Sequence, residues 1–158
     1  MNNATLCILI DENSKKILLG MKKRGFGEGK FNGFGGKPKE EEKIEDTAIR
    51  ELYEEAGVKV TKEELGKVGK LNFTFSEKPE WNQVVHLFIA KIWDGEPKES
   101  EEMRPEWFDF KQIPFEKMWQ DDKHWLPLVL EGKKLDADFT FGQDNETIKK
   151  YDIREVKE

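Results

Sequence analysis

The segment from residue 36 to residue 58 constrains the fold of this chain most, because it combines a helical apolar pattern with a dense set of acidic side chains. Its apolar residues recur at helical spacing, and they are Ile44, Ala48, Ile49, Leu52 and Ala56. This pattern predicts an amphipathic helix over 44–56. Acids in the first turn favour the start of such a helix, and Gly57 stands where glycine commonly ends one.

Three glutamates, Glu51, Glu54 and Glu55, lie close together on this predicted helix. At about 100° per residue, Glu55 falls at the edge of the apolar arc, Glu51 at its border and Glu54 slightly further round. A solvated charged face is the usual interpretation of a helix rich in glutamate. It fits badly here, because like charges at spacings of three and four repel each other and burial beside a core adds to the cost. Divalent cations compensate such charge, since Mg²⁺ prefers carboxylate oxygens and substrate phosphates, so the residues themselves indicate a metal site.

The same segment matches the pattern G-x5-E-x7-R-E-U-x-E-E-x-G-U, in which U is an aliphatic residue. The matching residues are Gly36, Glu42, Arg50, Glu51, Leu52, Glu54, Glu55, Gly57 and Val58. The chain therefore resembles the Nudix hydrolases, and residues 36–58 resemble their Nudix box. The resemblance implies an α/β/α sandwich with a mixed β-sheet between helices, formed by a single Nudix domain over residues 1–158.

The resemblance also implies roles for residues of the box. Glu51, Glu54 and Glu55 would be the metal-binding and catalytic carboxylates, and the carbonyl of Gly36 would lie near a metal ion. Arg50 would orient a box carboxylate through charge-assisted hydrogen bonds. The implied cofactor is Mg²⁺, or Mn²⁺ in its place.

Outside the box, three segments resemble one Nudix subgroup, the animal-type hydrolases of oxidised purine nucleoside triphosphates. They are ILLGMKKRGFGEGKFNGFGGK, ESEEMRPEWF and IPFEKMWQDDKHWLPL. The resemblance implies Mg²⁺-dependent hydrolysis of 8-oxo-dGTP and 2-hydroxy-dATP to the nucleoside monophosphate and pyrophosphate, which removes mutagenic nucleotides from the pool. Two alternatives stay open. One is hydrolysis of another nucleoside diphosphate derivative, such as a methylated purine triphosphate or a sugar nucleotide, and the other is nucleotide binding without catalysis.

The subgroup resemblance implies a base pocket that lies outside the box. Its polar residues would be Asn32, Asp121 and Asp122, and its apolar or stacking walls would be Phe26, Phe73, Trp119 and Trp125. Lys22 would lie near the sugar and phosphates, and Glu102 would join the box carboxylates near the metal. Cys7 is expected at the pocket floor, at a strand position where the subgroup has threonine.

The residues alone leave other interpretations open for several of these positions. Asp121 and Asp122 precede an apolar helical segment, so they could be its N-cap and first-turn acid. Trp119, Trp125 and Phe73 could simply belong to the core. If the two aspartates instead lie in an aromatic pocket, one is expected to keep its proton and donate a hydrogen bond while the other accepts.

The rest of the sequence predicts strands that form one mixed sheet. Residues 4–10 and 16–22 predict a hairpin, and further strands are predicted at 67–77, 81–93 and 102–110. A short helical turn and then a second helix are predicted up to residue 131. LDADFTF and TIKKYDI predict a closing hairpin. With two main helices, this order of elements indicates an α/β layer fold.

Composition and motif spacing exclude several classes of protein. The 158 residues carry a net charge of −6, which disfavours binding to polymeric nucleic acid. No apolar stretch approaches the length of a membrane span, no cationic leader precedes the first apolar run, and the lone Cys7 fits a reducing compartment. The glycine-rich residues 25–36 lack the spacing of a Walker A loop or a dinucleotide fingerprint. We therefore expect a cytoplasmic monomer that binds a small nucleoside triphosphate, and neither a membrane nor a nucleic acid.

Overall fold

The first two strands form the hairpin that the sequence predicts. In the computed structural model, which describes residues 2–157, β1 (Asn2–Asp11) pairs antiparallel with β2 (Lys16–Lys22). On its other side β1 pairs in parallel with β5 (Gln83–Ala90). Because β1 has a partner along both edges, it lies inside the sheet, and its apolar side chains are buried on both faces.

The strands form one 8-stranded mixed sheet in the order β3-β2-β1-β5-β4-β7-β8, with β6 also paired to β2. The strands not yet described are β3 (Phe31–Asn32), β4 (Gly66–Phe75), β6 (Met103–Asp109), β7 (Leu135–Phe141) and β8 (Ile148–Glu155). β4 and β7 pair in parallel, and β7 and β8 form the predicted closing hairpin.

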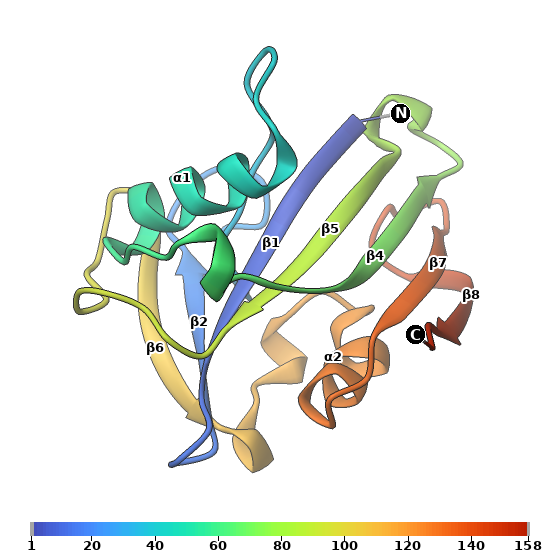
Figure 1. Cartoon of the computed structure of the whole chain (residues 1–158). Coiled ribbons are helices and arrows are strands. Elements are labelled where there is room, and N and C mark those ends of the chain that lie inside the picture. Colours follow the sequence, from blue (N-terminus) through green and yellow to red (C-terminus); the bar gives the residue numbers. More distant parts are fainter. Residues whose placement is uncertain (1, 158) are drawn as a thin grey trace.

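Two helices cover opposite faces of this sheet (Figure 1). Helix α1 (Ile44–Ala56) packs on the face where Cys7, Leu9 and Phe88 are buried. Helix α2 (Asp122–Leu130) packs on the other face, where Ile8 and Ile10 are buried. Successive side chains of a strand point to opposite faces, so β1 supplies both cores. The predicted α/β/α sandwich with a mixed sheet is therefore confirmed.

Helix α1 has the bounds that the sequence predicts. It ends at Gly57, whose φ of 71° is left-handed, and the Gly57 N–H donates to the carbonyl of Tyr53. Glycine takes this conformation without the steric cost that a Cβ imposes, so the helix stops there.

The two long central strands are shorter than predicted. β4 ends at Phe75 and β5 begins at Gln83, because Pro79–Trp81 form a 3-10 turn between them. The Trp81 ring contacts the rings of Phe75 and Phe26, so this residue packs at the end of the sheet instead of continuing the strand. The strand pattern predicted over 81–93 also overshoots at its end, since β5 stops at Ala90.

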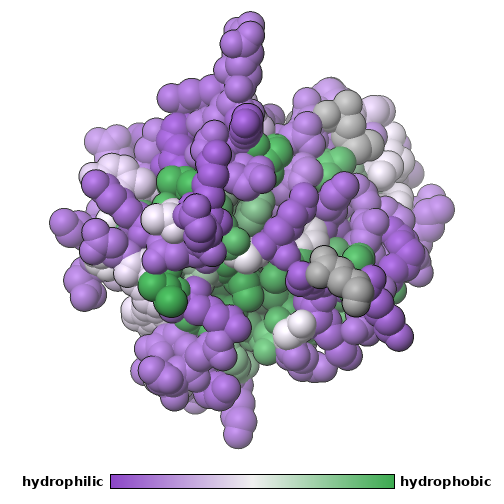
Figure 2. Space-filling view, viewed as in Figure 1, coloured by the Kyte–Doolittle hydropathy of each residue, from purple (hydrophilic) through white to green (hydrophobic). Residues whose placement is uncertain are grey.

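The surface agrees with the high charged fraction of the sequence. Figure 2 shows hydrophilic residues over most of one face, with apolar residues visible in the recessed centre of the view. Within residues 2–157, no helix is long and apolar enough to cross a membrane.

Candidate active site

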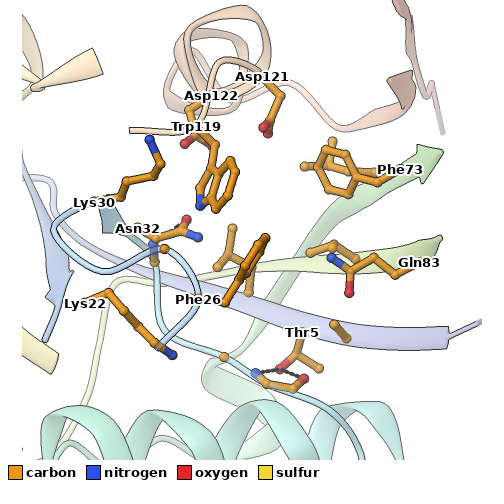
Figure 3. Close-up of a pocket in the computed structure, with 18 of the residues that line it drawn as sticks. Thr5, Lys22, Phe26, Lys30, Asn32, Phe73, Gln83, Trp119, Asp121 and Asp122 are labelled. Atoms are coloured by element: carbon orange, nitrogen blue, oxygen red, sulfur yellow. Dashed lines mark hydrogen bonds between the residues drawn. The ribbon is translucent and has the colours of Figure 1, made fainter. Parts of the chain in front are cut away.

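A cavity of about 240 Å³ lies between the sheet, helix α2 and the loops around β3 (Figure 3). Its apolar floor comes from four strands and includes Leu6, Leu71, Phe73, Phe75, Val85 and Phe141. Polar side chains line it at Asn32, Gln83, Asp121 and Asp122. The cavity continues to the box, where Thr5, Lys22, Gly35, Gly36 and Glu55 line it. One continuous space thus connects the predicted base pocket with the box.

Glu55 is the box carboxylate that lines this cavity, and the carboxylate of Glu51 lies against Gly36, which also lines it. Glu55 is 8% exposed, and its Oε1 accepts a hydrogen bond of 2.9 Å from the Gly35 N–H. Burial raises the pKa of Glu55 to about 7, and the charge of Glu51 adds to this shift. Burial also raises the pKa of Glu51. The two groups are therefore carboxylates that lack a nearby cation strong enough to offset their desolvation.

Two glycines bring the main chain close to both carboxylates. A Cβ at Gly36 would lie 2.1 Å from Glu51 Oε2, and a Cβ at Gly35 would lie 1.8 Å from the carbonyl oxygen of Thr5. The Gly36 carbonyl accepts a hydrogen bond of 2.8 Å from the Thr5 N–H. The chain therefore passes between β1 and α1 with no room for side chains, and this close approach places the Gly35 N–H on Glu55.

Arg50 holds the acidic residues around the box. Its Nε and Nη2 donate to the two oxygens of Glu42, at 2.8 and 3.0 Å, and its Nη1 donates to Glu54 Oε1 at 3.0 Å. Hydrogen bonds from Arg50 hold the pKa of Glu42 at about 2. Arg50 Nη1 lies 3.5 Å from Glu51 Oε2. Arg50 thus bridges three carboxylates, and the strongest contact is the bidentate one to Glu42.

Two of the predicted metal ligands are engaged elsewhere. Glu54 is bound by Arg50, and Glu102 accepts hydrogen bonds from Nε and Nη2 of Arg24 at 3.0 and 2.9 Å. Lys22 Nζ also lies 3.5 Å from Glu102 Oε2. Among the described residues, no three acidic, histidine or cysteine side chains are grouped closely enough to hold a metal ion. Glu54 and Glu102 would have to move toward Glu51 and Glu55 to share a metal ion with them.

The carboxylates of Glu51 and Glu55 nevertheless suit a divalent cation. Glu51 and Glu55 supply hard carboxylate oxygens, and a cation beside them would offset both the burial and the mutual repulsion that raise their pKa values. Mg²⁺ needs only one or two protein carboxylates, since water and substrate phosphates complete its shell. The pair Glu51 and Glu55 is thus sufficient to begin such a site.

Asp121 and Asp122 are both buried at the start of α2 and face the cavity. Asp121 occupies the N-cap position but makes no capping hydrogen bond; its Oδ2 accepts one of 2.8 Å from the Trp125 indole N–H. Burial raises the pKa of Asp121 to about 6. Burial, together with the charge of Asp121, raises the pKa of Asp122 well above its usual value. Asp122 Oδ2 has no hydrogen-bond partner, so a protonated Asp122 can donate into the cavity.

Aromatic rings close the outer side of the cavity. Phe26, which is 64% exposed, stacks on Trp119 with ring centroids 5.1 Å apart and meets the edge of Trp81 at 5.2 Å. Lys30 Nζ lies over the Trp119 ring, 5.0 Å from its centroid. Phe73 is buried and lines the floor. These positions agree with the predicted walls at Phe26, Phe73 and Trp119.

Two predicted pocket residues lie elsewhere. Cys7 is fully buried in the core under α1, where it packs with Leu9, Phe34 and Phe88, and it is not among the residues that line the cavity. The prediction of Cys7 at the pocket floor is therefore wrong, and the threonine that lines the cavity is Thr5. Trp125 is 1% exposed and lies behind Asp121, so it positions that carboxyl and does not form a wall.

Gln83, which is not among the site residues that the sequence indicates, lines the cavity from the first residue of β5. The signal that could have found it is strand periodicity. Gln83, Val85 and Leu87 alternate along β5, and the latter two belong to the core on the α2 side. A polar residue in phase with such apolar positions points toward the same face.

The raised pKa of Glu55 predicts an unusual stability profile for Glu55→Gln. The native carboxyl favours its proton, so its contribution to stability is complete below pH 4.5 and is lost as the pH rises through about 7. In buffer without divalent cations, Glu55→Gln is therefore expected to be more stable than the wild type at pH 8, by up to about 3 kcal/mol. Urea unfolding at pH 4.5 and pH 8 measures this. Equal stability of the two proteins at pH 8 would contradict a raised pKa of Glu55 in the folded protein.

Comparison with known proteins defines the class of this protein. The NUDIX domain matches residues 1–129, and the chain belongs to the Nudix family, whose hydrolases use divalent metal ions. The chain is 54% identical over 142 residues to the oxidized purine nucleoside triphosphate hydrolase of Mus musculus, which covers 90% of this chain and 88% of the mouse protein. It is 48% identical over 143 residues to the enzyme of the same name from Danio rerio, covering 90% and 89% of the two chains.

The fold agrees with that of a solved structure. The chain superposes on the crystal structure of a MutT protein from Bacillus halodurans with a TM-score of 0.82. The two sequences are 28% identical, and the superposition covers 97% of each chain. The similarity therefore extends through β7 and β8, which lie beyond the residues that the NUDIX domain matches.

Proposed function

We propose that this protein hydrolyses oxidised purine nucleoside triphosphates to the nucleoside monophosphate and pyrophosphate. The observation that carries the proposal is the single cavity that joins the buried pair Asp121 and Asp122 to the buried box carboxylate Glu55. The names of the mouse and zebrafish relatives support the same substrate class. By removing such nucleotides, the protein would keep mutagenic bases out of DNA.

Base recognition is assigned to the end of the cavity near α2. Asn32 and Asp121 would accept or donate along one purine edge, while a protonated Asp122 would donate to it. Trp119 and Phe26 would contact the faces of the ring from the outer side, with Phe73 beneath. The cavity is mostly apolar with a few convergent polar groups, which is the usual form of a small-molecule site.

Phosphate chemistry is assigned to the end of the cavity near the box. Glu51 and Glu55 would hold Mg²⁺, with Glu54, Glu102 and the Gly36 carbonyl completing the protein ligands. When bound, the cation neutralises phosphate charge and favours in-line displacement by water. Glu55, which lines this end of the cavity, would accept the proton of a water that attacks the β-phosphorus. Lys22 would contact the sugar-phosphate side.

A substrate panel tests this proposal. Pyrophosphate release would be measured with Mg²⁺ from 8-oxo-dGTP, 2-hydroxy-dATP and the four normal deoxynucleoside triphosphates, with and without EDTA. Strong preference for the oxidised purines, abolished by EDTA, is the expected result. If the protein instead hydrolysed a methylated purine triphosphate or a sugar nucleotide, the proposed substrate would be wrong and the proposed chemistry would stand. Saturable nucleotide binding without turnover would replace catalysis with a binding role.

The aspartate pair predicts a change in substrate ranking. Asp121→Asn and Asp122→Asn remove the ability of the pair to share one proton, so each is expected to alter kcat/KM for 8-oxo-dGTP relative to 2-hydroxy-dATP by about tenfold. Asp109→Asn, an exposed residue at the end of β6, is the matched control. Equal losses on both substrates would show that the pair has only a structural role.

The charge and composition of the chain also bear on the form of the substrate, the compartment and the oligomeric state. The substrate is a free nucleotide, because the net charge of −6 disfavours association with polymeric nucleic acid. A cytoplasmic monomer is the form in which we propose that the protein acts. Size-exclusion chromatography with light scattering tests whether the protein is a monomer.

A further inference from the structure

Gln83 is a polar side chain in an apolar part of the cavity. Its neighbours in the cavity lining from β4 and β5 are Leu71, Phe73, Phe75 and Val85. Its backbone is paired on both sides, with Phe73 of β4 and Asn2 of β1, so the main chain at this position is fixed. The side chain is half-buried and lines the cavity.

The Gln83 amide has no hydrogen-bond partner among residues 2–157, whereas the amides of Asn82 and Asn32 do. Asn82 Oδ1 accepts a hydrogen bond of 2.7 Å from the Phe75 N–H. Asn32 Oδ1 accepts one of 2.9 Å from the Gly33 N–H. These two amides therefore have a role in holding the chain. The Gln83 amide has no such role, and it offers both a donor and an acceptor to whatever fills the cavity.

Gln83 reaches the cavity from a different direction than the other polar residues. Figure 3 shows Gln83 and Asn32 on opposite sides of the view, with Asp121 and Asp122 at the α2 end. A purine has two separate polar edges. If the six-membered ring faces the aspartate pair, the five-membered ring is left without a polar partner from Asn32, Asp121 or Asp122.

We infer that Gln83 recognises the oxidised five-membered ring of the substrate. This inference rests on the proposed function. An 8-oxo-purine carries an N7–H donor beside a C8 carbonyl acceptor, whereas a normal purine carries only the N7 acceptor and a C8–H. A primary amide presents an acceptor beside a donor, so it can accept from N7–H and donate to O8 at the same time.

Burial makes this contact selective as well as attractive. A purine that fills the cavity removes water from the Gln83 amide. A normal purine can accept one hydrogen bond at N7 but leaves the amide oxygen unpaired, and an unpaired buried polar group is costly. Sites built to pair with a substrate group reject analogues that lack it for this reason.

Gln83→Met tests the inference, because methionine keeps the length of the side chain and removes both polar atoms. The kinetics of wild type and variant would be compared on 8-oxo-dGTP, 8-oxo-dATP, 2-hydroxy-dATP and dGTP. We expect kcat/KM to fall about tenfold for the two 8-oxo substrates, mainly through KM, and to stay unchanged or rise for the other two, because methionine removes the unpaired amide oxygen. In 2-hydroxy-dATP the oxidation lies on the six-membered ring, so this substrate is the internal control.

Two comparisons separate failure of the inference from other causes. Gln112→Met, at an exposed glutamine after β6, controls for the substitution itself, and thermal unfolding checks that Gln83→Met is folded. Wild-type preference for oxidised purines with unchanged 8-oxo kinetics in Gln83→Met overturns the inference and leaves the proposed function intact. Equal losses on all four substrates also overturn it. A wild type that turns over no 8-oxo-purine overturns both.

Discussion

Glu55→Gln is expected to lower kcat for 8-oxo-dGTP by about 10³-fold while KM changes only a few-fold. Glutamine can still accept the hydrogen bond from the Gly35 N–H, so the local structure is kept. It cannot accept a proton, and it supplies no charge to a cation. The loss is therefore expected in the chemical step, and initial-rate measurements with saturating Mg²⁺ check it.

The matched control for this substitution lies on the same helix. Glu45→Gln changes an exposed acid in the first turn of α1 and is expected to keep wild-type kcat. Taken with the stability profile, Glu55→Gln should be both more stable at pH 8 without divalent cations and nearly inactive. A variant that keeps more than about a tenth of wild-type kcat would place the base at another residue.

Gly35→Ala is expected to destabilise the protein by about 3 kcal/mol or more. The added Cβ would meet the carbonyl oxygen of Thr5 at 1.8 Å, and both groups are main chain or fixed to it, so the segment between β3 and α1 has to move. That movement would also take the Gly35 N–H away from Glu55, so kcat should fall in the folded fraction. Urea unfolding and initial rates measure the two effects.

Gly142→Ala is the matched control for the glycine substitution. A Cβ there would have its nearest neighbour, the Thr147 carbonyl oxygen, at 3.6 Å, which is an ordinary contact. Its effect on stability should stay within about 1 kcal/mol. If Gly35→Ala behaves like Gly142→Ala, the close passage of the chain between β1 and α1 is not what positions Glu55.

The fold could be predicted from sequence where short-range rules act alone. The helix at 44–56 follows from apolar spacing and a terminal glycine, and both hairpins follow from alternation and short turns. Strand ends were less predictable. Trp81 continues the apolar pattern of the following strand, yet it packs against Phe75 and Phe26 in a 3-10 turn, and this tertiary contact leaves no local signal.

Site residues could be predicted from the sequence where the pattern also showed which way their side chains point. The spacing of Glu51 and Glu55 on a helix placed both beside the core, and the structure has them there. Cys7 was assigned to the pocket floor, because the sequence does not show that Phe34 and the core under α1 cover this position of β1. Arg50 stands one helical turn before Glu54, so helical spacing does indicate that contact. The contact of Arg24 with Glu102 joins residues 78 positions apart, so no local pattern could show it.

The closing hairpin has a consequence for how this protein behaves at high concentration. β8 forms the outer edge of the sheet, where unpaired main-chain groups could recruit a strand from another molecule. Its exposed residues are almost all charged or polar, and they include Lys149, Lys150, Asp152, Arg154 and Glu155. A strand from another molecule that paired with β8 would lie against these charged side chains, so this edge resists aggregation. β7, the partner of β8 within the sheet, keeps Phe139 and Phe141 buried.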